Sequence, residues 1–327
     1  MRSMMLNSLN GNLNLVDLPK PACNPDEVLI RVLATSLNFA DTLLISGKYQ
    51  EKPKLPFAPG MEVCGIIETC GDSVFDFKVG ERIVAYVGFG GLTEFVTAKK
   101  HLCFQIPGTI PSEKAASLLI AYGSTELALN YKAKLQKDEV LLVFGASGGV
   151  GLSALQIGKA MGAFVIAVAR GKNKCLTAKR MGADLIFDSS TVDLKKELKA
   201  LDKLDVVFDP IGGSQFNDAL SAATPETRIL PIGFASGEIP NIPANIIMVK
   251  NVTLIGFQIG TYKTFKPEVL KACFNRLLKM WSANIIDPQI TEVFPLYRAN
   301  QALDVIRNRQ VTGKVIVTPW NQDRLKM

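Results

Sequence analysis

Short runs of alternating apolar and polar residues fill the first third of the chain. Such runs, when rich in β-branched residues and bounded by turn formers, predict strands. The clearest cover residues 27–34, 63–68, 82–86 and 92–98. Because prolines and glycines such as Pro53, Pro59 and Gly80 punctuate them, we expect an irregular β-barrel rather than an array of alternating strands and helices.

A different rhythm begins at Ser112, where a helix is predicted to run to Tyr131. Apolar strands then alternate with helices. The predicted strands cover residues 140–144, 164–169, 184–187, 205–208, 227–232 and 252–257, and the predicted helices cover residues 149–161, 174–181, 194–201 and 214–222. This alternation is typical of a parallel sheet with helices on both faces, so a six-stranded parallel sheet is expected.

The last part of the chain does not extend that set of strands. It predicts a helix from Thr264 to Ser282, a strand over residues 290–295, a helix over 297–307 and a strand over 314–318. The simplest interpretation is that this tail returns to complete the β-rich domain. We therefore expect an α/β protein with residues 1–120 and 262–327 in the β-rich domain and residues 121–261 in the domain with the parallel sheet.

Composition narrows the chemistry of this 327-residue chain. His101 is the only histidine, so zinc sites built on several imidazoles are excluded, and a Ser-His-Asp triad would have to use His101. We interpret His101 as a surface loop residue. The six cysteines form no C-x-x-C pair and are expected to be reduced thiols of a cytoplasmic protein.

Charge and hydropathy argue against two kinds of partner. The net charge is +7, but the basic residues are spread along the chain, as on a solvated surface. No basic run carries interleaved aromatic residues, so a nucleic-acid partner is not expected. The N-terminal segment is polar, unlike a signal peptide, and glycines interrupt the apolar stretch over residues 140–169, which argues against a membrane span.

The strongest local motif reads VLLVFGASGGVG over residues 140–151. An apolar strand runs into Gly145, and Gly148 and Gly151 precede a helix. Gly148 lets the backbone approach a pyrophosphate, Gly151 lets the helix pack closely on the strand, and the free N–H groups of the helix start face the phosphates. The pattern, in this strand–turn–helix setting, predicts a dinucleotide-binding Rossmann domain.

The end of the next strand indicates which dinucleotide is bound. NAD-selective Rossmann domains carry an acid about 20 residues beyond the glycine loop, where it bonds the ribose 2′-OH. Arg170 stands there, and Lys172 and Lys174 follow. Cations at this place fit a 2′-phosphate, so NADPH is the predicted cofactor; the alternative is that the lysines simply face solvent.

Further motifs, in order along the chain, resemble a known family. They read LNFAD at residues 37–41, SGKY at 46–49, LPFAPGME at 55–62, GERI at 80–83 and TGK at 312–314. From about Glu27 to Thr318 the chain is similar to zinc-free quinone oxidoreductases of the zeta-crystallin type, within the medium-chain dehydrogenase/reductase superfamily. The resemblance implies a GroES-like β-barrel catalytic domain beside the Rossmann domain.

The resemblance also bears on metal. Zinc-dependent relatives hold a catalytic metal with a cysteine where Asn38 stands and a histidine where Met61 stands. Neither ligand is present at its position, and the cysteine-rich lobe of the structural zinc is missing. No metal is therefore expected. Asp41 and Glu62 are interpreted as structural carboxylates, each paired with a basic side chain.

Site residues follow from the same resemblance. It implies that Asn38 and Tyr49 lie beside the nicotinamide. It assigns the cofactor contacts to Ser124 for the carboxamide, to Ala146, Ser147, Gly148, Gly149 and Val150 for the pyrophosphate, to Lys174 with Arg170 for the 2′-phosphate, and to Gly233, Phe234 and Arg309 nearby. Leu43, Ser189 and Glu126 depart from the family pattern, which affects the substrate more than the cofactor.

The leading hypothesis is an NADPH-dependent reductase of quinones or α,β-unsaturated carbonyl compounds. The alternatives are an enoyl-thioester reductase and, in another class, a non-catalytic protein that binds NADPH or RNA. A zinc alcohol dehydrogenase is a distant fourth. A homodimer is also expected, because the apolar strand from Val252 to Phe257 would form an uncharged sheet edge.

Overall fold

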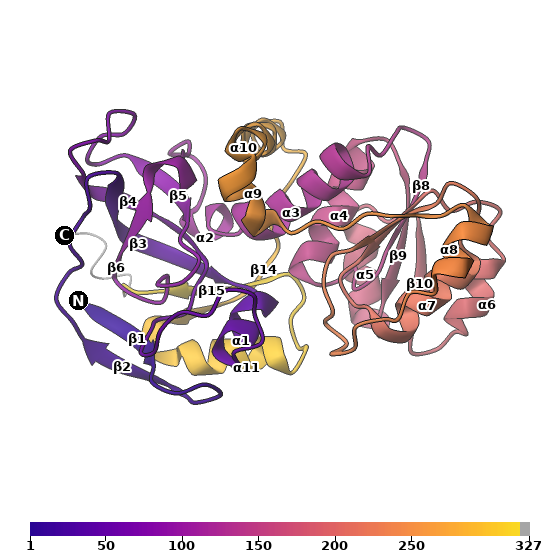
Figure 1. Cartoon of the computed structure of the whole chain (residues 1–327), viewed down its shortest axis with the longest axis horizontal. Coiled ribbons are helices and arrows are strands. Elements are labelled where there is room, and N and C mark those ends of the chain that lie inside the picture. Colours follow the sequence, from indigo (N-terminus) through magenta and orange to yellow (C-terminus); the bar gives the residue numbers. More distant parts are fainter. Residues whose placement is uncertain (321–327) are drawn as a thin grey trace. The chain divides into compact units, whose positions relative to one another are not determined.

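A computed structural model describes residues 1–320 of the chain. The chain forms two compact units (Figure 1). The first consists of Met1–Ile120 together with the described residues from Pro288 onward, and the second of Ala121–Asp287.

The first unit is built on one seven-stranded sheet. Its order is β14-β15-β3-β4-β5-β7, with β6 paired to β3, and every pair is antiparallel except β14 with β15. The strands are β3 (Glu27–Leu37), β4 (Glu62–Cys70), β5 (Arg82–Tyr86), β6 (Phe95–Lys99), β7 (Cys103–Gln105), β14 (Ile290–Pro295) and β15 (Lys314–Thr318). The tail thus returns to the β-rich unit through β14 and β15.

Shorter elements complete this unit. A two-stranded antiparallel sheet, β1 with β2, lies at the N-terminus. The elements are β1 (Arg2–Leu6), β2 (Leu13–Asp17), α1 (Phe39–Ile45), η1 (Lys100–Leu102), α2 (Ser112–Ala115), η4 (Leu296–Arg298) and α11 (Ala299–Arg307). The apolar pattern did not predict β1, β2 or α1.

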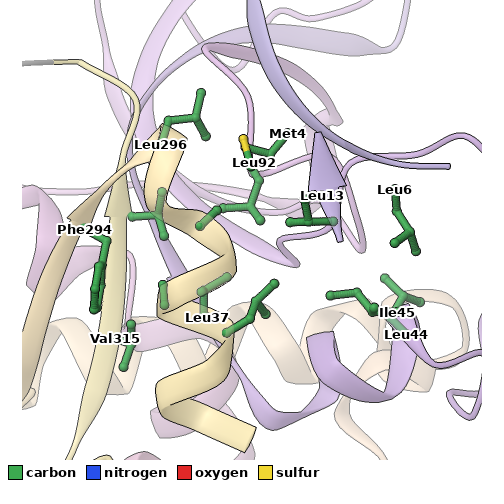
Figure 2. Close-up of a cluster of buried hydrophobic side chains, with 14 of the residues drawn as sticks. Met4, Leu6, Leu13, Leu37, Leu44, Ile45, Leu92, Phe294, Leu296 and Val315 are labelled. Atoms are coloured by element: carbon green, nitrogen blue, oxygen red, sulfur yellow. The ribbon is translucent and has the colours of Figure 1, made fainter. Parts of the chain in front are cut away.

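One hydrophobic cluster joins the two ends of the chain (Figure 2). It contains Met4 and Leu6 of β1, Leu44 of α1, and Phe294 and Val315 of β14 and β15. Their side chains expose 6% of their surface or less. Burial of residues so distant in sequence anchors the returning tail, since each buried aliphatic or aromatic side chain stabilises the fold by ~1.5–3 kcal/mol.

The second unit contains a six-stranded parallel sheet of order β10-β9-β8-β11-β12-β13. The strands are β8 (Val140–Val143), β9 (Phe164–Ala169), β10 (Leu185–Asp188), β11 (Val206–Asp209), β12 (Arg228–Pro231) and β13 (Thr253–Leu254). The order reverses between β8 and β11, and ligands of such sheets bind at this switch point, beyond the carboxyl ends of the strands.

Helices lie on both sides of this sheet (Figure 1). The helices of the second unit are α3 (Gly123–Glu126), α4 (Gly149–Ala160), α5 (Lys172–Arg180), α6 (Leu194–Lys199), α7 (Gly213–Ala222), α8 (Ala244–Lys250), α9 (Ile259–Phe265) and α10 (Pro267–Ser282). The Rossmann-type unit and the six strands of the prediction are thereby confirmed.

The helix predicted from Ser112 to Tyr131 is a run of short helical segments. After α2 come η2 (Leu118–Tyr122), α3 and η3 (Leu127–Lys132). The hydroxyls of Ser117 and Thr125 donate to the carbonyls of Glu113 and Ala121, four residues back. Such bonds disturb the regular helical ladder.

The structure differs from the predicted length of one strand and from one predicted domain boundary. The strand from Val252 to Phe257 is reduced to two residues in β13, because the paired strand β12 ends at Pro231, which has no N–H to continue the ladder. Residues 262–287 lie in the second unit rather than the first. There α10 packs on α3, and the Arg276 guanidinium bonds the Glu126 carboxylate.

Candidate functional site

The turn after β8 brings the backbone close to itself at two glycines. Gly145 has a φ of +55°, in the left-handed region that favours glycine. A Cβ on Gly151 would lie 2.2 Å from the Gly145 carbonyl oxygen and 2.7 Å from Ala146 Cα. Because both neighbours are backbone atoms, only glycine at 151 lets α4 begin so close to the strand.

Gly148 is different, because no protein contact requires it to be glycine. Its φ of −79° and ψ of 169° suit any residue, and a Cβ there would meet only the Gly145 carbonyl oxygen, at 3.5 Å. A glycine with open space in front of its backbone fits a bulky ligand that must approach that backbone closely.

The amide groups of this turn divide into two sets. The N–H of Ala146 donates to Val168 O at 3.0 Å, and that of Gly148 to Gly145 O at 3.0 Å. The N–H groups of Ser147, Gly149 and Val150 carry no hydrogen bond to the described residues, and no side chain caps α4. Unpaired N–H groups at the start of a helix can bind an anion. The N–H of Ala146, which was predicted to face the pyrophosphate, is already bonded to Val168 O and is not available for this.

The end of β9 carries the cations that the sequence singled out. Arg170 is exposed and Lys174 is half-buried in the first turn of α5. Between them Gly171 has a φ of +88° and donates its N–H to Asp188 Oδ1 at 2.8 Å.

Asp188 is a neighbour that sequence spacing did not reveal. It ends β10, and Ser190 donates both its hydroxyl and its N–H to Asp188 Oδ1. The Ser190 hydroxyl, then the Gly171 and Ser190 N–H groups, lower the pKa of this half-buried aspartate. Ser189 is tied to the same turn, since its hydroxyl and N–H both reach Ala169 O.

The carboxyl ends of β11 and β12 complete this edge of the sheet. The Gly233 N–H donates to Asp209 O at 3.4 Å, and the Phe234 side chain, 37% exposed, lies against the Gly212 turn. Parallel strands end at one edge of a sheet, so the turns after β8, β9, β11 and β12 gather there.

Asp209 was also missed by sequence reasoning. Its Oδ1 accepts the N–H groups of Ile211 and Gly212 at 2.8 and 2.9 Å, whereas its buried Oδ2 has no hydrogen-bond partner among the described residues. Burial raises the pKa of this carboxyl against the effect of the two N–H groups. The neutral acid is therefore favoured more than in an exposed aspartate.

Ser124 is a buried residue of α3, two positions before the ion-paired Glu126. The carboxylate of Glu126, 2% exposed, accepts from the Arg276 guanidinium and from Asn130 Nδ2 at 2.7 Å. Glu126, which departs from the family pattern, is thus neutralised within the second unit.

The first unit places Asn38 at the junction of β3 and α1. Its N–H donates to Asp41 Oδ2 at 2.8 Å, and Gly60 donates to Asp41 Oδ1 at 3.0 Å. Burial raises the pKa of Asp41 to about 7, and the two N–H groups and Lys314 offset this only in part. Asp41 is structural as expected, but its partners are backbone N–H groups rather than a basic side chain.

Glu62 does pair with a basic side chain. Lys314 Nζ lies 3.3 Å from Glu62 Oε1, and both residues are buried. Glu62 Oε2 accepts the N–H of Ile120 at 2.9 Å. The expectation that Glu62 is an ion-paired carboxylate is confirmed, and only the structure identifies Lys314 as its partner.

Tyr49 packs half-buried against the hydrophobic cluster of Figure 2. Tyr86 lies nearby: burial raises the pKa of its hydroxyl, and Glu51 and Tyr49 raise it further. Tyr86 faces Glu62 across the β4–β5 pair, a placement that no sequence motif marked. Arg309 is exposed in the turn after α11, with a φ of +55°.

Within the described residues no three histidine, cysteine, aspartate or glutamate side chains gather as a metal site would require. His101 is exposed, in agreement with its interpretation as a surface residue. Across residues 1–320 no helix has both the length and the apolar character that crossing a membrane demands.

The structure gathers only some of the predicted residues. The glycine turn, Arg170, Lys174, Gly233 and Phe234 lie at the carboxyl edge of the parallel sheet. Ser124 lies in α3 of the second unit, whereas Asn38, Tyr49 and Arg309 lie in the first unit. The role of these residues in binding a cofactor stays a prediction.

Two family models match the chain. One, described as "Zinc-binding dehydrogenase", matches residues 149–275. The other, described as "Alcohol dehydrogenase GroES-like domain", matches residues 24–108. Together with the sheet of the second unit they confirm the expected combination of a GroES-like and a nucleotide-binding domain.

Relatives cover nearly the whole chain. "Quinone oxidoreductase-like protein 2" of Bos taurus is 36% identical over 305 residues, which cover 92% of this chain and 87% of that protein. "Quinone oxidoreductase" of Rattus norvegicus is 31% identical and covers 92% of each chain. The quinone oxidoreductase of Escherichia coli, solved in complex with NADPH, is 26% identical with a TM-score of 0.91 over 98% of this chain and 100% of that one. The chain therefore belongs to the quinone oxidoreductase-like proteins of the medium-chain dehydrogenase/reductase superfamily.

Proposed function

We propose that this chain binds NADPH and uses it to reduce quinones or α,β-unsaturated carbonyl compounds, without zinc. The observation that carries the proposal is the turn after β8. Gly148 leaves its backbone uncovered by a side chain, and three neighbouring N–H groups have no partner among the described residues. When bound, NADPH supplies the hydride, and the protein positions it. The relative from Escherichia coli was solved with NADPH.

Coenzyme choice is assigned to the turn after β9. Arg170 and Lys174 supply cations there, while Asp188 Oδ1 accepts one hydrogen bond from Gly171 of this turn and two from Ser190. The neighbouring carboxylate is thus occupied in shaping the turn. Charge-assisted bonds from the two cations would favour a 2′-phosphate over a 2′-hydroxyl.

The reaction centre is assigned to Asn38 and Tyr49, with Ser124, Gly233, Phe234 and Arg309 as further cofactor contacts. Asp41 and Glu62 are the carboxyls nearest Asn38, and both oxygens of each already accept hydrogen bonds. Both side chains are also completely buried, so neither carboxyl reaches a substrate to protonate it. We therefore assign the proton to water.

The residues around Asn38 do not fit a zinc ion. The Lys314 ammonium lies 2.6 Å from Asn38 Oδ1, so a cation already occupies the surroundings of the residue that replaces the metal-binding cysteine. Met61, in place of the histidine, is 1% exposed and belongs to the hydrophobic cluster of Figure 2. An ammonium beside a second, divalent cation would be repelled.

NADPH oxidation by the purified protein tests the function. The acceptors are a benzoquinone, a small enone and an enoyl thioester, each assayed with NADPH and with NADH. We expect turnover with the quinone or the enone, and faster reaction with NADPH. Faster reaction with the thioester would support the enoyl-thioester reductase. Tight NADPH binding with no turnover of any acceptor would support a binding protein.

We also propose that two copies pair through β13. It is the last strand of its sheet, and the N–H groups of Thr253 and Ile255 donate to Thr227 O and Ile229 O of the β12 side. Because successive N–H groups of a strand point in opposite directions, Leu254 directs its N–H to the open edge. Pairing with the same edge of a second copy would satisfy it.

Light scattering at micromolar concentration tests this contact. We expect a dimer for the wild type and for Leu254→Ala, and a monomer for Leu254→Pro, which lacks the N–H at the open edge and keeps the bonds to β12. Thr253→Pro is not suitable, because its N–H serves β12. A monomeric wild type, or a Leu254→Pro variant that remains a tight dimer, would rule out pairing through this edge.

A further inference from the structure

Lys314 is a buried lysine whose hydrogen-bonding capacity is fully used. Its ammonium donates to Leu37 O at 3.1 Å, to Asn38 Oδ1 at 2.6 Å and to Glu62 Oε1 at 3.3 Å. An ammonium has three N–H donors, so each of them has an acceptor. Lys314 is 4% exposed, and it has no donor left for a ligand.

These contacts allow only one orientation of the Asn38 carboxamide. Nδ2 donates to Glu62 Oε1 at 2.9 Å and to Ser36 O at 3.3 Å, while Oδ1 accepts from Lys314. The reversed amide would set its NH2 group against an ammonium and its oxygen against a carboxylate. An ammonium cannot accept and a carboxylate cannot donate, so the reversed orientation has no hydrogen bond to either group.

The exposed fractions show which residue of the cluster formed by Asn38, Glu62 and Lys314 a ligand can reach. Glu62 is 0% exposed, Lys314 4% and Asn38 8%. Both Nδ2 hydrogens of Asn38 are engaged. What remains for a ligand is the second lone pair of Oδ1, since an amide oxygen carries two.

We infer that Lys314 and Glu62 are positioning residues that fix Asn38 as a hydrogen-bond acceptor; this rests on the assignment of Asn38 to the reaction centre under the proposed function. The partner that fits Asn38 is an N–H or O–H donor, such as a primary carboxamide or the hydroxyl of a reduced product. A substrate carbonyl oxygen, which only accepts, does not fit. Asn38 therefore does not stabilise developing charge on that oxygen.

A double-mutant cycle tests whether Lys314 acts through Asn38. The variants are Asn38→Ala, Lys314→Met and the two combined, and the measured quantities are kcat and KM for reduction by NADPH. We expect Lys314→Met to lower kcat/KM at least tenfold in the wild-type chain and less than twofold in the Asn38→Ala chain. Lys20→Met is the matched control, because Lys20 pairs with Glu68 on the surface of the same unit, and it should leave kcat/KM unchanged.

A second variant covers the case in which Lys314→Met does not fold. Lys314→Met combined with Glu62→Gln removes both buried charges, so no unpaired carboxylate remains. The new glutamine side chain would still offer an oxygen to Asn38 Nδ2, but Oδ1 would lose its donor. We expect this neutral pair to fold and to show the same loss of kcat/KM as the cycle predicts for Lys314→Met.

An independent readout does not depend on turnover. In protein labelled with 15N-asparagine, the side-chain amide signal of Asn38 is assigned by its absence in Asn38→Ala. Both of its hydrogens are bonded in the wild type, so we expect slow exchange with solvent there. In the neutral pair Oδ1 has lost its donor, so the carboxamide can turn out of these bonds, and we expect exchange at least tenfold faster. Unchanged exchange between the two would overturn the positioning role.

The two kinds of failure are distinguishable. If no acceptor is reduced, the proposed function fails, and amide exchange still decides whether Lys314 and Glu62 hold Asn38. If the acceptors are reduced but the losses of the two single variants multiply in the combined one, the positioning role fails and the proposed function stands.

Discussion

Gly148 and Gly151 of the turn after β8 are predicted to respond differently to substitution. A side chain at 151 would collide with the backbone, whereas one at 148 would enter open space. Gly148→Ala adds a methyl group that meets nothing nearer than the Gly145 carbonyl oxygen at 3.5 Å. Gly151→Ala adds one that lies 2.2 Å from the same oxygen. The first change should affect the ligand and the second should affect the fold.

The magnitudes follow from these distances. A methyl group at 148 would hold a phosphate away from the N–H groups of Gly149 and Val150, and charge-assisted bonds contribute ~1.5–3 kcal/mol each. Losing two of them weakens NADPH binding by roughly 100-fold to 20,000-fold. At 151, ordinary contact begins at 3.4 Å, so backbone must move by more than about 1 Å, and overpacking of this kind costs ~1–3 kcal/mol.

Calorimetric titration with NADPH and urea denaturation measure the two effects separately. We expect Gly148→Ala to keep the wild-type free energy of unfolding and to lose NADPH affinity, and Gly151→Ala to lose stability. Wild-type NADPH affinity in Gly148→Ala would show that the pyrophosphate does not lie against this turn. A loss of stability in Gly148→Ala as large as that in Gly151→Ala would contradict the reasoning from Cβ contacts.

Three further predictions concern charge. Replacing Arg170 and Lys174 with alanine should weaken NADPH by ~1.5–3 kcal/mol for each contact and NADH far less; equal losses in binding titrations of the two coenzymes would refute the assignment. The pKa of Asp41 is about 7 in the folded protein, against an ordinary value of 3.8. The unfolded chain therefore loses this proton first, and the free energy of unfolding falls as pH rises from about 4 to about 7. At about 1.4 kcal/mol per pH unit the total loss is on the order of 4 kcal/mol. Asp41→Asn should therefore gain stability relative to the wild type across that range in urea denaturation, and a constant difference between the two proteins would contradict this. Elemental analysis should find substoichiometric zinc and chelators should leave NADPH oxidation unchanged, whereas one tightly bound zinc per chain would overturn the argument from Asn38 and Met61.

The parallel sheet could be predicted from the sequence because its signals are local. Each strand is a short apolar run, and each is followed by a turn and a helix with its own pattern. β9 has the predicted bounds, and β10 and β11 are each shifted from theirs by one residue. The glycine turn was found for the same reason, since strand, turn and helix lie within about a dozen consecutive residues.

The elements that were missed depend on distant partners. β1 pairs with β2, but the hydrophobic cluster of Figure 2 buries it against residues from the other end of the chain. The length of β13 depends on Pro231 in β12. Asp188 lies beside Gly171 only because β10 pairs with β9. Sequence spacing around each element carries none of this information.

The cluster around Asn38 shows the same limit at the level of chemistry. A motif located Asn38, but the group that sets its amide orientation is 276 residues away. Two strand registers bring them together: Val315 opposes Leu37 in the β15–β3 pair, and Glu62 opposes Ser36 in the β3–β4 pair. A shift of either register by one residue would turn the ammonium or the carboxylate to the opposite face of the sheet. What Asn38 offers a ligand is therefore determined by strand pairing, and a local motif can name the residue without naming its role.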